Sequence, residues 1–415
     1  MPSNYKRLGD YIQEVNVRNR DLNSIPLLGV SIKKVLMPSI ANIIGTDMSS
    51  YKLIQKNQFA YGPVTSRNGD KISIALLQEY DVAMVSQAYT VFEVIDGREL
   101  LPEYLMMWFR RPEFDRYARF MSHGSAREIF SWTEMRDTMI PIPSPEKQQE
   151  IVTEYNTIQN RIALNNQLIS KLEETAQAIY KQWFVEFEFP FVTSSGVEMP
   201  YKSNGGKMVW CEELEKKIPE GWEYGSLGDL STQFSGFSFK GEEYSFEEGI
   251  TVVRGENVTE KRLRWNTHKK WSLKLDARIT KCFLENGDIV IGMDGSKVGK
   301  NWALVSKYDL PLLLAQRVTS VRSKKLENSY FIYISMMVLN FEFYVSQVQT
   351  GTSIPHISGQ QIANFPIIIP STEILDLFSI KAKIKYDSIS LYNHQLIKLE
   401  ELKELLLAKM TRVEN

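Results

Sequence analysis

The chain has 415 residues, 43% of them hydrophobic, and a formal net charge of −1. This length predicts two or three globular domains, and the composition excludes an intrinsically disordered chain. The apolar runs are too short to span a bilayer, and the start at Met1 carries no signal-peptide pattern, so we expect a cytoplasmic protein. Two cysteines, Cys211 and Cys282, are too few for a disulfide framework or a zinc cluster. The net charge does not indicate strong nucleic-acid binding by the whole chain.

Residues 1–143 are expected to form a first globular domain. Short runs rich in β-branched and aromatic residues alternate with turn residues, which is typical of strands. The expected strands are 26–32, 58–61, 72–77 and 90–95. One or two helices are expected between Leu101 and Phe120, where Pro102 and Pro112 fit first-turn positions. Short strands mixed with a few helices predict an α+β domain.

Residues 144–190 are predicted to form one long helix. Ser144 fits the N-cap, Pro145 fits the first helical position, and neither Gly nor Pro interrupts the run before Pro190. Apolar residues recur at alternating spacings of four and three, which is typical of a coiled-coil seam. The seam positions are Ile151, Tyr155, Ile158, Ile162, Asn165, Ile169, Leu172, Ala176, Ile179 and Trp183. Asn165 would fix the register with a partner helix. The alternative is a long buried helix with one hydrogen-bonded Asn.

The second half of the chain repeats the first. Gly124-Ser125 matches Gly351-Thr352 at a spacing of 227 residues, and the register continues without a gap to the shared sequence Lys-Leu-Glu-Glu at 171–174 and 398–401. The chain is therefore a tandem duplication in which each half is one globular domain followed by one long helix. Between the halves, residues 191–220 are rich in Gly, Ser, Pro and charge, and we expect an irregular connector.

Residues 221–370 are expected to form the second α+β domain and residues 371–415 the second long helix. The expected strands are 250–254, 288–293, 302–306 and 317–321, with helices in 330–348. The seam of the second helix is less regular, because Lys385 and Lys403 interrupt it. Its seam residues include Ile389, Leu396, Leu399 and Leu406.

A pseudo-twofold axis between the halves would pair the two long helices antiparallel. The predicted fold class is therefore α+β, with two small, pseudo-twofold-related mixed α/β domains separated by two long antiparallel coiled-coil helices. In this arrangement Ile158, Ile162, Ile169 and Leu172 should be buried between the helices.

Catalytic motifs are not evident. Gly295 to Asn301 is one residue short of a phosphate-binding loop and has Asn301 where a Ser or Thr must reach magnesium. The four His residues are scattered, so we expect no bound metal. Without a catalytic motif, we also expect no bound cofactor and no catalysis by this chain.

Basic residues are concentrated in 251–307, where twelve Lys and Arg stand against six acidic residues. A smaller basic cluster lies in the first domain. A single basic run is usually a solvated face, but two such regions in equivalent domains make phosphate contacts an equally good interpretation.

The domain ends carry a resemblance. The sequence Ile-Pro-Ile-Pro-Ser-Pro-Glu-Lys-Gln-Gln-Glu-Ile at 140–151, the sequence from Gly351 to Ser358, and the strand and glycine turn from Ile289 to Gly299 resemble the DNA specificity subunit of type I restriction–modification systems. The resemblance covers nearly the whole chain. It departs at 370–374, where the glutamines of the first helix start are missing, and at Tyr61-Gly62-Pro63, which replaces the usual glycine turn.

The resemblance implies a function in DNA recognition. Each globular domain would be a target-recognition domain that reads one half of a split double-stranded DNA sequence, through polar and basic loop residues that reach major-groove edges. The helix pair would set the unread gap and dock two modification (methyltransferase) subunits. S-adenosylmethionine, ATP and magnesium would be bound by the modification subunits and by the restriction (translocase and nuclease) subunits. The candidate DNA-binding residues are Arg67, Asn68, Lys71, Gln87, Ser125, Arg127, Arg254, Asn257, Lys297, Lys300, Gln316, Arg317 and His356.

Two alternatives remain open from the sequence. One is a free-standing DNA-modifying enzyme, which would turn over without partner subunits. The other is a coiled-coil scaffold without a nucleic-acid role, against which neighbouring genes for a methyltransferase and a helicase-nuclease would argue.

Overall fold

The computed structural model describes residues 5–22, 24–40, 45–66, 68–124, 127–192, 196–265, 268–351 and 353–412. The chain divides into two compact units, one comprising Met1–Ala163 with Ile397–Asn415 and the other Leu164–Leu396. Each unit therefore contains one globular domain and one part of both long helices.

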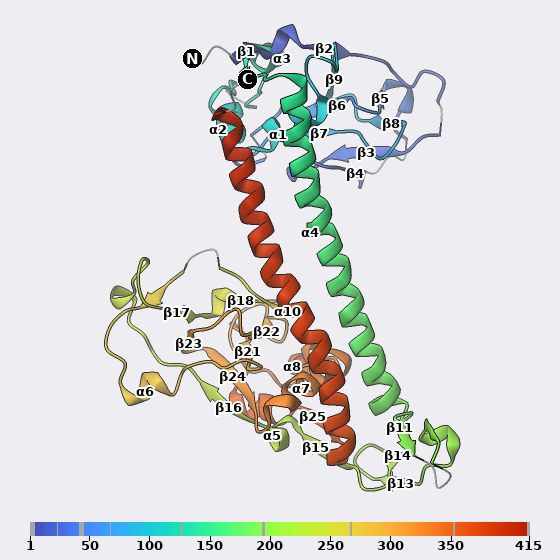
Figure 1. The fold of residues 1–415 in the computed structure, drawn as a ribbon, viewed down its shortest axis with the longest axis vertical. Coiled ribbons are helices and arrows are strands. Elements are labelled where there is room, and N and C mark those ends of the chain that lie inside the picture. Colours follow the sequence, from blue (N-terminus) through green and yellow to red (C-terminus); the bar gives the residue numbers. More distant parts are fainter. Residues whose placement is uncertain are drawn as a thin grey trace. The chain divides into compact units, whose positions relative to one another are not determined.

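The first domain contains two four-stranded sheets (Figure 1). The antiparallel sheet has the order β2 (Ile12–Val15), β9 (Thr90–Val94), β6 (Phe59–Gly62), β7 (Ser73–Leu76). The mixed sheet has the order β4 (Leu36–Pro38), β3 (Leu27–Val30), β8 (Val82–Val85), β5 (Lys52–Gln55), with β3 and β8 parallel. Alternate residues of β6 face opposite sides. Phe59 and Tyr61 pack with the helices, whereas Ala60 packs with the mixed sheet.

Helices α1 (Pro102–Arg110), α2 (Pro112–Phe120) and α3 (Trp132–Asp137) complete this domain, and β1 (Tyr5–Arg7) pairs with β10 (Met139–Pro141). The four strands and the helices expected from the sequence are present. The strands that were not expected are β1, β2, β4, β5, β8 and β10, because runs of three or four residues carry little periodicity.

The second domain repeats this topology. Its antiparallel sheet has the order β16 (Ser231–Ser235), β24 (Val318–Ser323), β21 (Ile289–Gly292), β22 (Trp302–Leu304). Its other sheet has the order β20 (Lys270–Trp271), β17 (Ile250–Val253), β23 (Leu312–Leu314), with β17 and β23 parallel. The remaining elements are β18 (Val258–Thr259) paired with β19 (Arg262–Leu263), β15 (Glu223–Ser226) paired with β25 (Pro366–Ile369), and helices α5 (Leu227–Leu230), α6 (Ala277–Thr280), α7 (Ser329–Val338), α8 (Phe341–Val348) and α9 (Gly359–Ala363). The antiparallel sheets have the same strand order and, among the described residues, the second mixed sheet lacks a strand equivalent to β5, so the topology agrees with the tandem duplication.

The connector is not irregular, contrary to the expectation from its composition. It forms two antiparallel hairpins, β11 (Pro190–Val192) with β12 (Glu198–Pro200) and β13 (Met208–Cys211) with β14 (Lys216–Pro219). The hairpins are stabilised by aromatic packing from both flanks, since Phe189 stacks on Trp222 with ring centroids 4.8 Å apart. This contact between residues distant in sequence leaves no local signal in the composition.

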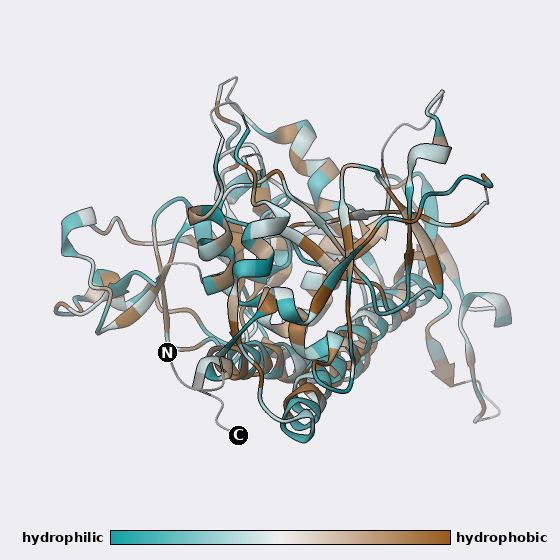
Figure 2. Cartoon of the chain, turned by 90° about the horizontal axis from the view of Figure 1, so that it is seen from above, coloured by the Kyte–Doolittle hydropathy of each residue, from teal (hydrophilic) through white to brown (hydrophobic). Residues whose placement is uncertain are grey.

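The two long helices are α4 (Pro145–Tyr180) and α10 (Thr372–Lys409). Figure 2 shows hydrophilic and hydrophobic residues alternating along them, as expected for helices with one packed face. Helix α4 ends at Tyr180, earlier than the end at residue 190 that the sequence predicted. It passes into a π-helical turn at Lys181–Val185, so Trp183 belongs to this turn rather than to the heptad.

In the second unit the two helices pair antiparallel. The amide Nδ2 of Asn165 donates to Oε1 of Gln395 at 3.1 Å, whereas the ring of Tyr180 packs on that of Phe378 at 5.9 Å. The sequence number therefore rises along one helix as it falls along the other. Asn165 is completely buried, in agreement with the predicted seam.

The seam residues differ in burial. Ile151, Asn165, Ile169, Trp183 and Ile389 are buried, while Ile158, Ile162, Leu172, Ile179, Leu396, Leu399 and Leu406 are half-buried. Of the four residues expected to be fully buried between the helices, only Ile169 is. A pair of helices covers each seam side chain on one side only, so water reaches its flanks.

In the first unit, the start of α4 is fixed to the globular domain by Gln148. This buried side chain accepts a hydrogen bond from the backbone N of Leu101 at 2.8 Å and donates to the carbonyl of Glu99 at 2.8 Å and to that of Pro143 at 2.9 Å. At the start of α10 the repeat places Leu375, which is also buried. The missing glutamine in the second repeat is thus replaced by apolar packing.

Among the described residues, no single helix has the length and apolar composition needed to cross a bilayer; the segments Leu326–Val338 and Phe341–Val348, bent by 71°, meet those criteria only when they are combined.

Candidate nucleic-acid interface

The candidate interface of the second domain begins where β21 ends. The backbone N of Ile357 donates to the carbonyl of Met293 at 3.0 Å, and the N of Gly295 donates to the carbonyl of Pro355 at 3.1 Å. These two bonds hold the turn after β21 against the segment that precedes α9. Asp294 and His356 therefore stand opposite each other as an isolated β-bridge.

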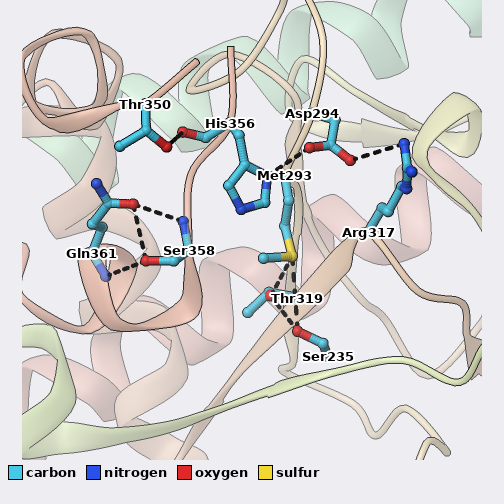
Figure 3. Close-up of polar contacts among 9 residues, drawn as sticks. All are labelled: Ser235, Met293, Asp294, Arg317, Thr319, Thr350, His356, Ser358 and Gln361. Carbon is cyan, nitrogen blue, oxygen red and sulfur yellow. Dashed lines mark hydrogen bonds and ion pairs between the residues drawn. The ribbon is translucent and has the colours of Figure 1, made fainter. Parts of the chain in front are cut away.

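Asp294 connects two of the candidate DNA-binding residues (Figure 3). Its Oδ1 lies 2.6 Å from Nδ1 of His356, and its Oδ2 lies 3.6 Å from a terminal nitrogen of Arg317. The side chain of Asp294 is 24% exposed, that of His356 41% and that of Arg317 74%. A partly buried carboxylate thus positions two nitrogen-bearing side chains that remain open to solvent.

Arg317 lies in the turn between β23 and β24 and has a positive φ of 67°. A left-handed backbone is uncommon for a residue other than glycine and costs conformational free energy, so it persists only where the surroundings hold it. Here the backbone N of Met293 donates to the carbonyl of Arg317 at 3.0 Å, which fixes the turn. The arginine side chain projects from a rigid position.

The buried side chain of Thr319 supports the turn from the sheet. The hydroxyl of Thr319 donates to the sulfur of Met293 at 2.9 Å and lies 3.1 Å from the hydroxyl of Ser235 (Figure 3). Thr319 stands on β24 and Ser235 on β16, which pair antiparallel. The sheet therefore holds the turn after β21 in place.

The segment that carries His356 is fixed at both ends. The backbone N of His356 donates to the carbonyl of Thr350, and the N of Thr350 donates back, both at 2.8 Å. Ser358 then caps α9 in a reciprocal capping box with Gln361. The backbone on both sides of His356 is thus held by hydrogen bonds.

Three other predicted residues of this domain lie near the same loops in sequence. Gln316 is exposed beside Arg317, and Lys297 is exposed in the turn after β21. Lys300 instead pairs with Glu342 of α8 at 3.0 Å, and this carboxylate raises the pKa of Lys300. The positive charge of Lys300 is therefore compensated by Glu342 within the chain.

The turn after β17 does not present the two residues predicted there. Asn257 is 2% exposed, accepts a hydrogen bond from the backbone N of Arg254 at 3.0 Å and donates to the carbonyl of Arg264 at 3.1 Å. Both ends of its amide are used to shape the turn, which favours a structural role for Asn257 over the predicted DNA contact. Arg254 is half-buried, pairs with Glu256 and lies 5.8 Å from the ring of Tyr244, which favours a structural role.

In the first domain, two predicted residues line a common pocket. Asn68 and Arg127 border a pocket of about 370 Å³ together with Val64, Tyr89 and Ser86. The amide of Asn68 donates to the carbonyl of Val64 at 3.2 Å, whereas Arg127 is exposed. The pocket lies at the ends of β6 and β8, beside the turns where DNA contacts were expected.

The other predicted residues of the first domain do not line this pocket. Lys71 and Gln87 are exposed in turns. Arg67 and Ser125 lie outside the described residues.

Sequence reasoning missed Asp294. An acidic residue was not considered as part of a DNA-binding surface, because DNA is an anion. Its role depends on Arg317 and His356, which are distant in sequence, although Asp294 does lie inside the strand and glycine turn from Ile289 to Gly299.

Comparisons with known proteins identify the family. Residues 32–174 and 219–404 match the type I restriction modification DNA specificity domain. The chain is 26% identical to the type I restriction enzyme MjaIX specificity subunit of Methanocaldococcus jannaschii, over 76% of this chain and 70% of that protein. It is 21% identical to the HindI specificity subunit of Haemophilus influenzae, over 97% of both chains.

A solved structure shows the same fold. The S subunit of a type I restriction–modification system from M. genitalium superposes with a TM-score of 0.60 at 12% identity, covering 99% of this chain and 96% of that one. The family match extends over both repeats, each with its globular domain and most of its long helix. The chain therefore belongs to the family of type I restriction–modification DNA specificity proteins.

Proposed function

We propose that this chain is the DNA-reading subunit of a type I restriction–modification complex, and that each globular domain reads one half of a bipartite target. The observation that carries the proposal is the repeated domain itself. Both copies bring polar residues to the end of the same central strand, β6 in the first and β21 in the second. A duplicated reading surface fits two separate half-sequences better than one continuous sequence.

The loops at these strand ends carry the chemistry that reads base edges. Arg and His side chains donate hydrogen bonds to acceptors in the major groove, and Asn and Gln bond adenine. Arg317, His356 and Gln316 provide this set in the second domain, and Asn68 and Arg127 provide it in the first. The exposed Lys297 and Lys71 are suited to contact phosphates, which position the protein on the duplex.

The long helices set the distance between the half-sequences in this proposal. α4 contains 36 residues, which corresponds to about 54 Å at about 1.5 Å per residue. Packing and the Asn165–Gln395 hydrogen bond fix the register of the two helices. A fixed register gives a fixed spacing, so bases in the gap need not be read.

The outer face of α10 supports the proposed docking of modification subunits. Exposed apolar residues follow one another along the helix at Leu377, Ile380, Ile384, Leu391, Leu402 and Leu405. At about 3.6 residues per turn these positions share one side of the helix, opposite the buried Phe378, Ala382 and Ile389. Exposed apolar residues that share one side of a helix are typical of a protein–protein interface.

In this proposal the chain itself is not catalytic. The modification subunits bind S-adenosylmethionine and methylate adenine, while the restriction subunits use ATP and magnesium. The specificity chain determines where on the DNA the partner subunits act.

The proposal is tested by methylation in a defined system. The full chain is mixed with its modification subunits, S-adenosylmethionine and genomic DNA, and the methylated positions are mapped by sequencing. We expect methylation only when both components are present, at a motif with two read segments and an unread gap. Methyl transfer by the chain alone would favour a free-standing enzyme, and unchanged, sequence-independent methylation with or without the chain would favour a scaffold.

A further inference from the structure

Equivalent backbone hydrogen bonds identify which residues of the two candidate interfaces occupy the same position in each domain. In the first domain the N of Phe130 donates to the carbonyl of Pro63 at 2.8 Å. In the second domain the N of Ile357 donates to the carbonyl of Met293 at 3.0 Å. Pro63 is therefore equivalent to Met293, and Phe130 to Ile357.

A second pair of bonds confirms this alignment. The N of Thr65 donates to the carbonyl of Glu128 at 3.0 Å, and the N of Gly295 donates to the carbonyl of Pro355 at 3.1 Å. The residue between the two bonds on each segment is consequently matched as well.

The matched residues differ in chemistry. Val64 forms an isolated bridge with Ile129 in the first domain, where Asp294 forms one with His356 in the second. Val64 is thus equivalent to Asp294, and Ile129 to His356. The apolar pair stands where the second domain has a carboxylate and an imidazole.

Strand pairing gives the counterpart of Arg317. Tyr61 pairs with Thr90 in the first domain, and Ile291 pairs with Thr319 in the second. Counting back from these threonines along β9 and β24, Ala88 occupies the position of Arg317. Asp294, Arg317 and His356 are therefore each replaced by an apolar residue in the first domain.

We propose that the two domains read opposite classes of base at this equivalent position: Arg317, positioned by Asp294, reads a guanine in the half-sequence of the second domain, and Val64, Ala88 and Ile129 contact the methyl group of a thymine in the half-sequence of the first. This inference rests on the proposed function and specifies what each surface recognises.

The guanine assignment follows from the donors of Arg317. A guanidinium has five N–H donors and no acceptor, and its bidentate partner in the major groove is guanine, through O6 and N7. The carboxylate of Asp294 lies 3.6 Å from one terminal nitrogen, which leaves the other donors of the fork for the base. Asp294 is a positioning residue, because pre-orienting a flexible side chain lowers the entropy cost of binding.

The thymine assignment follows from the absence of donors on the three matched side chains. Ile129 is 40% exposed and Ala88 is exposed, and both Val64 and Ala88 line the pocket of about 370 Å³. An apolar surface at a base edge contacts the thymine methyl group, which is the apolar feature of the major groove. Asn68 and Arg127 at the rim of the pocket are placed to contact the neighbouring groups.

Base analogues test both halves in the assembled complex. The full chain with its modification subunits is bound to duplexes that carry the mapped motif, in which each guanine of the second half-sequence is replaced in turn by 7-deazaguanine, which lacks N7. Each thymine of the first half-sequence is replaced in turn by uracil, which lacks the methyl group. We expect one deaza position and one uracil position to weaken binding by wild type.

Variants assign these effects to residues. In Arg317→Ala the sensitive guanine position should lose its discrimination, about 5- to 150-fold by the usual value of a bidentate contact, and the deaza substitution should have no further effect. Asp294→Asn should reduce the same discrimination by less. The uracil effect in the first half-sequence should persist in both variants, which also shows that each protein is folded, and Ile129→Ser should reduce it.

Other outcomes separate this inference from the proposed function. If Arg317→Ala keeps the full deaza effect, or if uracil is tolerated at every position, the base assignment is overturned while bipartite recognition stands. If wild-type complex binds no two-part sequence, the proposed function itself fails.

Discussion

At the scale of single residues, burial in the seam sets the expected cost of truncation. Ile169 is 5% exposed and packs in the core of the second unit, whereas Leu164 of the same helix is 43% exposed. We expect Ile169→Ala to lower the free energy of unfolding by about 2 to 5 kcal/mol, and the matched control Leu164→Ala to change it by less than about 0.5 kcal/mol. Urea unfolding followed by circular dichroism measures both, and equal losses would contradict the packed seam.

The polar pair in the seam gives a second prediction. Asn165 is completely buried, and its side-chain amide donates a hydrogen bond to Oε1 of Gln395. Gln395→Leu should therefore leave the amide of Asn165 unpaired and cost about 1 to 3 kcal/mol, because a buried donor loses its partner without regaining water.

The double variant is the control for this pair. Changing Asn165 and Gln395 together to Leu should recover the lost stability or exceed it, since no buried polar group then remains. Urea unfolding of the single and double variants gives the coupling energy. A double variant less stable than Gln395→Leu would show that the pair itself stabilises the helices.

Single residues were only partly predictable from the sequence. Arg317 and His356, two of the candidates named from the sequence, lie together around Asp294, whereas the amide of Asn257 closes a turn onto the backbone. Asp294 could not be found by local reasoning. Arg317 is brought to it by the pairing of β21 with β24, and His356 by the isolated bridge between Asp294 and His356, and both depend on contacts between residues distant in sequence.

At the scale of elements, periodic patterns predicted more than composition did. The heptads of α4 and the repeat of the domain could be recognised in the sequence because they extend over many residues. The hairpins β11–β12 and β13–β14 were missed, because a segment rich in Gly, Ser and Pro suggests loops, and its strands depend on packing by Phe189 and Trp222.

The long helices yield a prediction about spacing. Insertion of four residues near Asn165, with four more near Tyr392 in the facing helix, should lengthen the pair by about 6 Å at about 1.5 Å per residue. DNA rises about 3.4 Å per base pair, so the added length of the helices corresponds to nearly two more base pairs in the gap. The added rotation of one turn and roughly 40° corresponds to about one base pair.

We therefore expect a gap longer by one or two base pairs, with both read segments unchanged. Slight bending of the DNA can absorb the difference between the two demands. Methylome sequencing of cells that carry the lengthened chain reports the motif directly. An active variant that keeps the original gap would show that the helices do not set the spacing.

At the scale of the whole molecule, the account depends on two domains that recognise DNA independently. The domains share the strand order of the antiparallel sheet and equivalent backbone hydrogen bonds at its edge, but they differ in the chemistry at the end of the central strand. A common scaffold with different side chains at one place is suited to reading two different sequences. If the domains are independent, each domain must recognise the same half-sequence when the other domain is replaced.

Exchange of residues 1–143 for the equivalent domain of another specificity subunit tests this requirement most directly. The measurement is the methylated motif in cells that carry the chimera and the modification subunits, compared with the motif of the parent. The account predicts that one half of the motif changes to that of the donor while the other half and the gap are retained. A change in both halves would contradict it, because recognition would then be shared between the domains.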